Sequence, residues 1–172
     1  DYGRYVTTGC KSVLDLLMSY QVNPHYYGEY STSADPSNGI PDILDEAGDE
    51  LEWLFKRQDT YGGVYSKVMT QQFPGSILPQ NDNAPLYLME VDTLATADFA
   101  SAMALASEVY QDFDTDFSKR CLEASKNAFN FLLGNPEFIY HDNPEGFAGG
   151  DYRDESDIDE RLNASLLLYT AT

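Results

Sequence analysis

The densest group of side chains able to do chemistry is an acidic run near the end of the chain, Asp151-Tyr152-Arg153-Asp154-Glu155-Ser156-Asp157-Ile158-Asp159-Glu160. Hard cations such as Ca²⁺ bind six to eight oxygens from carboxylates and carbonyls, and a turn leading into a helix can present such oxygens. The spacing does not fit an EF-hand loop, which needs glycine at its sixth position. The alternative is a solvated first helical turn, where acidic residues favour the helix dipole. On composition alone, both interpretations stay open.

The other reactive side chains are isolated from one another. Cys10 and Cys121 are too far apart for a local metal or redox motif, and their partly apolar surroundings predict buried thiols. His25 and His141 each lack a neighbouring Cys or second His, which favours positions on the surface or the rim of a site. Six tyrosines could offer ring faces to sugars, and the sequence does not rank them: Tyr26, Tyr27, Tyr30, Tyr61, Tyr65 and Tyr87.

Composition excludes several classes of partner. The 172 residues carry 29 acidic and 10 basic side chains, a formal net charge of −19. Phosphate binding needs clustered Lys and Arg, so this balance argues against nucleic acid, and equally against an anionic membrane surface. No apolar stretch approaches the roughly 20 residues that a spanning helix needs. With 42% hydrophobic and 13% aromatic residues, we expect one folded, acidic, soluble domain.

The elements that must position these groups are mostly helical. Apolar residues recur at helical spacing in five segments, around residues 13–20, 42–55, 92–110, 114–134 and 157–169. Asp92 or Thr93 can cap the third of these, and its many alanines suit an inner position. Gly62-Gly63 is expected to end the second helix, and residues 61–90 are β-prone and rich in proline, which predicts a hairpin or extended excursion. Trp53, on the second helix, is expected to pack in the core.

Four motifs, in order along the chain, resemble glycoside hydrolase family 9 cellulases of the kind with an upstream immunoglobulin-like module. They are Asp1-Tyr2-Gly3-Arg4-Tyr5-Val6, Gly39-Ile40-Pro41-Asp42-Ile43-Leu44-Asp45-Glu46-Ala47, Thr93-Leu94-Ala95-Thr96-Ala97-Asp98-Phe99-Ala100 and Asp159-Glu160-Arg161-Leu162 with Leu168-Tyr169. The resemblance implies an all-α fold, part of an (α/α)6 toroid. It also implies a secreted or periplasmic enzyme that cleaves β-1,4-glucans with inversion of configuration.

The resemblance also implies roles for individual residues. It makes Asp1 the general base that activates water, a task that an inverting glycosidase pairs with a carboxylic acid roughly 6.5–9.5 Å away. The acid, a Glu, and a first Asp that positions the water would lie outside residues 1–172. A structural Ca²⁺ is implied at Asp159 and Glu160, with Glu155 and Ser156 contributing oxygens.

Both ends of the sequence read as cut, so residues 1–172 are expected to be one partial catalytic domain, inactive without its missing N- and C-terminal parts. Its expected partner is a β-glucan polysaccharide or oligosaccharide. Two alternatives remain at this stage. One is a non-catalytic, helical carbohydrate-binding or interaction module. The other is a different α/α-toroid enzyme, such as a polysaccharide lyase or an exo-acting glucosaminidase.

Overall fold

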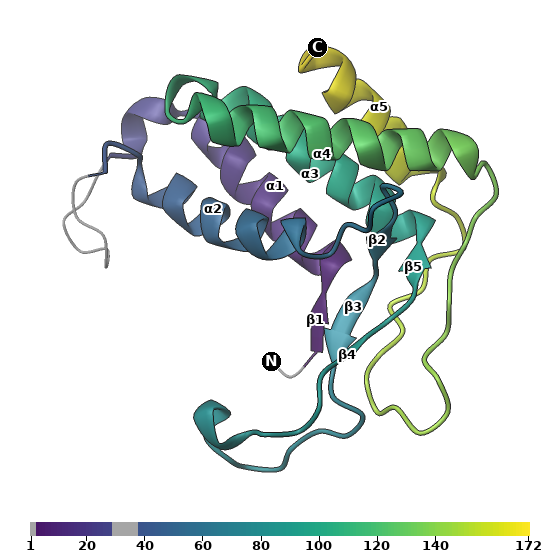
Figure 1. The fold of residues 1–172 in the computed structure, drawn as a ribbon. Helices are drawn as coiled ribbons and strands as arrows, with labels where there is room; N and C mark the ends of the chain where they lie inside the picture. Colours follow the sequence, from purple (N-terminus) through teal and green to yellow (C-terminus); the bar gives the residue numbers. More distant parts are fainter. Residues whose placement is uncertain (1–2, 29–37) are drawn as a thin grey trace.

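A computed structural model describes residues 3–28 and 38–172 of the chain. The described residues form five α-helices, and all five predicted helical segments are confirmed (Figure 1). The helices are α1 (Val6–Val22), α2 (Asp42–Phe55), α3 (Thr93–Val109), α4 (Thr115–Gly134) and α5 (Ile158–Thr170). Within the described ranges, no helix is both long and apolar enough to cross a membrane.

Helix α3 lies at the centre and packs against α1, α4 and α5. Fifteen of its 17 residues are buried, the exceptions being Asp98 and Glu108. Its alanines allow neighbouring helices to approach closely, so the predicted inner position is confirmed. The Asp92 side chain caps this helix, with Oδ1 accepting a hydrogen bond of 2.6 Å from the amide of Ala95.

The hydrophobic core fills the space between these helices. Buried stripes at helical spacing face inward from α1, α2 and α4, and they meet Phe99 and Met103 of α3: Val6, Cys10, Val13, Leu17, Leu44, Ala47, Leu51, Leu54, Cys121, Ala124 and Ala128. Both cysteines are free and buried, as predicted. Trp53 is partly buried and packs against the edge of this core.

Helix α2 ends earlier than expected. It stops at Phe55, because the amides of Lys56 and Arg57 turn back to the carbonyls of Trp53 and Leu54. A separate turn over residues 59–63 follows. There Gly62 adopts a φ of +95°, and a Cβ on it would lie 2.2 Å from the Asn127 carbonyl oxygen. The glycine pair thus lets this turn press against α4 and does not form the end of the helix.

Short strands lie beyond the N-terminal end of α1 (Figure 1). Strands β1 (Gly3–Tyr5), β3 (Lys67–Met69) and β4 (Tyr87–Leu88) form an antiparallel sheet in the order β1-β3-β4, and β2 (Val64–Tyr65) pairs with β5 (Val91–Asp92). The excursion between α2 and α3 is therefore confirmed, whereas the strand β1 that it pairs with was not predicted. In the register, Tyr5 lies opposite Lys67, and Gly3 opposite Met69.

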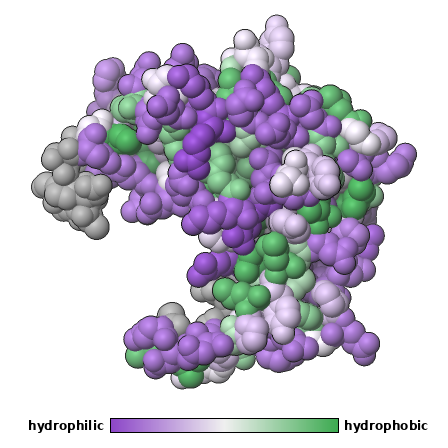
Figure 2. Space-filling model, viewed as in Figure 1, coloured by the Kyte–Doolittle hydropathy of each residue, from purple (hydrophilic) through white to green (hydrophobic). Residues whose placement is uncertain are grey.

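The segment between β3 and β4 extends away from the helices as an arm (Figure 1). It contains a short 3₁₀ helix, η2 (Pro79–Asn81); two others are η1 (Pro24–Tyr26) and η3 (Tyr110–Asp112). Figure 2 shows a recess between the arm and the helical layers, with hydrophobic surface on the neck that joins them. Exposed apolar side chains of this region are Phe73, Ile77, Leu78, Leu86, Tyr87 and Leu88.

Candidate functional site

The proposed base, Asp1, lies outside the described residues, but the strand that follows it is well fixed. Strand β1 begins at Gly3 and is held along its length by β3. The amide of Val6, where α1 begins, donates to the Ser66 carbonyl over 2.9 Å. The chain from Gly3 to Val6 is thus anchored both to the small sheet and to the start of a core helix.

The central strand of this sheet, β3, begins with a buried lysine. Lys67 is 3% exposed, and its Nζ donates to the Gly150 carbonyl over 3.1 Å. The same atom lies 3.6 Å from Oδ1 of Asp151 and 5.5 Å from the centre of the Tyr5 ring. Burial lowers the pKa of the Lys67 ammonium, and the nearby carboxylate of Asp151 opposes that shift.

The loop over residues 140–152 is folded onto the face of the sheet that carries Tyr5 and Lys67. The Tyr140 hydroxyl donates to the Asp151 carbonyl, and the Asn143 amide donates to Oδ1 of Asp151 over 2.9 Å. The Tyr5 and Tyr152 rings meet edge to face, with centroids 4.7 Å apart. The β1 strand and this loop therefore form one connected unit.

The acidic turn after this loop is anchored by Asp157 and Arg161, which were not among the predicted ligands. Asp157 is 3% exposed, and its Oδ1 forms an ion pair with Nε of Arg161 at 2.9 Å. The Arg161 guanidinium also donates to the carbonyls of Leu132 (3.0 Å) and Asn135 (2.9 Å), which joins α5 to the end of α4. The sequence could have indicated this ion pair, because Asp157 and Arg161 are four residues apart at the start of a helix.

The four predicted metal ligands lie within this turn and the first turn of α5. Glu155 and Asp159 are exposed, whereas Ser156 and Glu160 are partly buried. The Ser156 hydroxyl oxygen accepts a hydrogen bond from the amide of Ile158. Burial raises the pKa of Glu160, and its contact with Asp159 raises it further. The structure therefore brings Asp159 and Glu160 together, with Glu155 and Ser156 nearby in sequence.

Two oxygens in this region, Oδ2 of Asp157 and Oε2 of Glu160, are buried and have no hydrogen-bond partner among the residues that the structure describes. Such oxygens suit a hard cation, so the donor chemistry fits calcium. Within residues 3–28 and 38–172, however, no three Asp, Glu, His or Cys side chains are grouped so that they could hold a metal ion. The described residues provide part of an oxygen-rich site.

Two further carboxyls interact electrostatically with this turn, Asp92 of β5 and Asp98 of α3, and neither was predicted as a site residue. Burial is the main cause that raises the pKa of Asp92 to about 6 and that of Asp98 to about 7. Glu160 and Asp159 raise the pKa of Asp98 further, while His141 and Lys67 lower that of Asp92. The sequence did hold a signal for Asp98, because it is an acidic residue within an alanine-rich helix that was expected to lie inside the fold.

Comparison with known proteins identifies the family of this chain. The sequence profile of glycosyl hydrolase family 9 matches residues 1–172. The chain belongs to glycosyl hydrolase family 9.

Family 9 relatives extend beyond the matched region. A cellodextrinase from Butyrivibrio fibrisolvens is 36% identical over 177 residues, covering 100% of this chain and 32% of that protein. The crystal structure of a metagenome-derived family 9 endoglucanase has a TM-score of 0.95 at 35% identity, covering 100% of this chain and 32% of that one. AaCel9A in complex with a cellobiose-like isofagomine has a TM-score of 0.92 at 37% identity, covering 99% and 33%. This chain thus spans about a third of the length of these relatives, and its helices match the (α/α)6 barrel of the family.

A cavity of about 300 Å³ lies beside the sheet of the family 9 chain. Lys67, Tyr87, His141 and Phe147 are among its lining residues. The Tyr87 and Phe147 rings meet edge to face at 5.2 Å, and Nδ1 of His141 lies 3.1 Å from Oε2 of Glu90. Of the six tyrosines considered as sugar platforms, Tyr87 is the one that belongs to the three-stranded sheet with β1.

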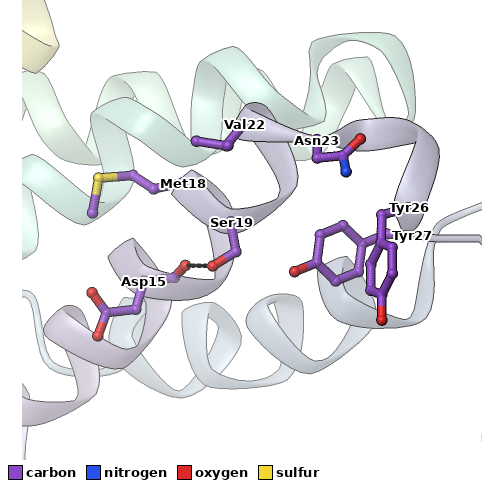
Figure 3. Close-up of a pocket in the computed structure, with 7 residues that line it drawn as sticks. All are labelled: Asp15, Met18, Ser19, Val22, Asn23, Tyr26 and Tyr27. Atoms are coloured by element: carbon purple, nitrogen blue, oxygen red, sulfur yellow. Dashed lines mark hydrogen bonds between the residues drawn. The ribbon is translucent and has the colours of Figure 1, made fainter.

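A second cavity, of about 460 Å³, lies at the far end of α1 and includes Tyr26 and Tyr27 (Figure 3). These rings meet edge to face at 5.2 Å, and Tyr27 also contacts Tyr20. A 17-residue helix is about 25 Å long, so this pair is about that far from β1. Tyr26 and Tyr27 therefore lie far from β1; Tyr30 lies outside the described residues.

Proposed function

We propose that the protein containing this chain hydrolyses β-1,4-glucosidic bonds in cellulose or a related β-glucan, with inversion at the anomeric carbon. The observation that carries this proposal is the match of all 172 residues to family 9. The names of the relatives, a cellodextrinase and endoglucanases, support the same substrate class.

In this mechanism, the Asp1 carboxylate is the general base. It removes a proton from a water molecule as that water attacks the anomeric carbon, while a carboxylic acid protonates the leaving oxygen. The resemblance to the family places that acid, a Glu, outside residues 1–172. The contribution of this chain is to hold the base, because β1 is anchored to β3 and to the start of α1.

Residues 1–172 are proposed to be part of one larger catalytic domain. In support, α5 presents an exposed apolar stripe at helical spacing: Ile158, Leu162, Leu166 and Tyr169. Further helices of a toroid would cover such a stripe. A secreted or periplasmic location is proposed with it, because a polymeric glucan is an extracellular substrate.

A structural calcium ion is proposed at Asp159 and Glu160, with oxygens from Glu155 and Ser156. Bound there, calcium would neutralise clustered carboxylates and rigidify the turn. Its test is the melting temperature of Glu160→Gln with calcium and with chelator, beside Glu145→Gln, an exposed control. Wild type and the control should lose stability on chelation, whereas Glu160→Gln should respond less. The absence of a calcium effect in wild type would refute the site.

The activity is tested by incubating the protein with cello-oligosaccharides and following the anomeric protons by NMR. We expect the α-anomer to form first. First formation of the β-anomer would contradict inversion. An unsaturated product absorbing in the ultraviolet would indicate a lyase, and binding without cleavage would favour the non-catalytic module.

A further inference from the structure

Lys67 occupies an unusual environment for a lysine. Its side chain is 3% exposed, in a region where a buried ammonium needs partners to offset the loss of water. Its partners are the Gly150 carbonyl oxygen at 3.1 Å, Oδ1 of Asp151 at 3.6 Å and the face of the Tyr5 ring at 5.5 Å. One buried charge therefore contacts two segments that are about 145 residues apart along the chain.

The two segments approach each other closely around this ammonium. Tyr5 lies opposite Lys67 in the β1–β3 pairing, and the loop comes so near the same face that a Cβ on Gly149 would lie 2.2 Å from the Met69 Cε. On the loop side, Asn143 donates its side-chain amide to the Gly149 carbonyl over 2.7 Å and its backbone amide to Asp151. The ammonium of Lys67 is thus a buried polar link between β1 and a loop that is itself internally bonded.

Both linked segments continue into groups with a proposed chemical role. Strand β1 begins two residues after Asp1, and the loop leads within a few residues to Glu155 and Ser156 of the acidic turn. A shift of about 1 Å in a catalytic group can cost roughly 100-fold in rate. A link between these segments is therefore placed to control the position of the base.

We propose that Lys67 is a positioning residue: it fixes the strand that follows Asp1 against the loop at 149–152, and thereby sets the rate of glucan hydrolysis more than substrate affinity. This inference rests on the proposed function. A methionine, similar in length, would occupy the buried space beside the Tyr5 ring without donating a hydrogen bond. Because the Asp151 side chain is 44% exposed, water can solvate its carboxylate once the ammonium is gone, so the fold should survive that substitution.

The test compares Lys67→Met, Lys67→Arg and the control Lys119→Met in the protein that contains this chain. Lys119 is an exposed lysine on α4, paired weakly with Asp116. We expect Lys67→Met to lower kcat about 10- to 100-fold on cellotetraose, with KM changed by less than about threefold. Lys67→Arg, which keeps the charge and donors, should recover part of the loss, and Lys119→Met should match wild type.

Hydrogen exchange of the same proteins tests the link without relying on activity. In Lys67→Met, amides in residues 3–6 and 140–152 should exchange faster than in wild type, while those of α3 stay protected. Unchanged exchange in both segments would refute the link, even for a protein that hydrolyses no glucan. Faster exchange with a kcat within about twofold of wild type would refute the positioning role. If Lys67→Met does not fold, Asp151→Ala removes the carboxylate partner from the surface, and it is held to the same two criteria.

Discussion

Two regions of this molecule are held together by different interactions. Around α3, apolar and small side chains fill the space between four helices, and Phe99 and Met103 are fully buried there. The loops and helix ends are joined by polar contacts: Lys67 beside β1 donates to a loop carbonyl, and at the junction of α4 and α5 Arg161 pairs with Asp157 and donates to backbone carbonyls. The core thus depends on packing, whereas the loops and helix ends depend on a few directed bonds.

This difference has a consequence for how the site can be altered. Apolar packing is spread over many contacts, so its strength depends on volume and not on any one orientation. A buried polar link depends on each partner, because removing one leaves the other unsatisfied. Single substitutions should therefore change the global stability in one region and local order or chemistry in the other.

The largest effect is expected in the core. Phe99→Ala removes a fully buried ring from α3 and should lower the free energy of unfolding by about 3–5 kcal/mol. Leu78→Ala, on the exposed arm, is the control and should change it by less than about 0.5 kcal/mol. Urea unfolding of both variants measures the difference. Equal losses would show that the arm is packed as tightly as the core.

Breaking the ion pair that joins α4 and α5 should lower the free energy of unfolding nearly as much. Arg161→Met leaves the buried Asp157 carboxylate without its cation and should cost about 3–5 kcal/mol. Arg120→Met removes an exposed, bidentate pair with Glu52 and should cost less than about 1 kcal/mol. Thermal and urea unfolding distinguish the two. A small effect at Arg161 would mean that water reaches this junction.

The buried cap of α3 gives a pH-dependent effect. Because burial raises the pKa of Asp92 to about 6 from its ordinary 3.8, the folded state binds this proton more tightly than the unfolded state. The contribution of Asp92 to stability is therefore present below about pH 4 and is lost as the pH rises through about 6. In Asp92→Asn, which can still cap the helix, the loss of stability between pH 4 and 7 should shrink by on the order of 3 kcal/mol.

A second variant at this position separates the cap from the titration. Asp92→Ala removes both, so it should also lose about 1 kcal/mol of capping energy at every pH. Unfolding free energies across this pH range provide the measurement. An Asn variant with the full pH dependence of wild type would show that other groups cause it.

The smallest expected effect compares two glycines with positive φ. Gly39, at φ +84°, has open space within 4 Å of where a Cβ would lie, so Gly39→Ala should cost only the backbone strain of about 1–2 kcal/mol. Gly62→Ala adds a clash with the Asn127 backbone and should cost at least about 1 kcal/mol more. If thermal unfolding shows equal losses, the contact between this turn and α4 is loose.

The sequence alone predicted where the five helices lie, because helical periodicity and caps such as Asp92 and Asp114 are local signals. It was not sufficient for β1, a three-residue strand that exists through a partner more than 60 residues away. The acidic turn was predicted from its composition, but its anchor was not. Lys67 was missed because lysine is normally exposed, and nothing near it in sequence shows the carbonyl of Gly150 that it binds.

The central claim is that Asp1, two residues before strand β1 in the sequence, is the general base. The most direct measurement is the rate of cellotetraose hydrolysis by Asp1→Asn, in the protein that contains this chain, beside Asp15→Asn on the exposed side of α1. We predict that Asp1→Asn loses activity by at least about 100-fold at unchanged stability, and that Asp15→Asn retains it. Wild-type rates for Asp1→Asn would contradict the claim.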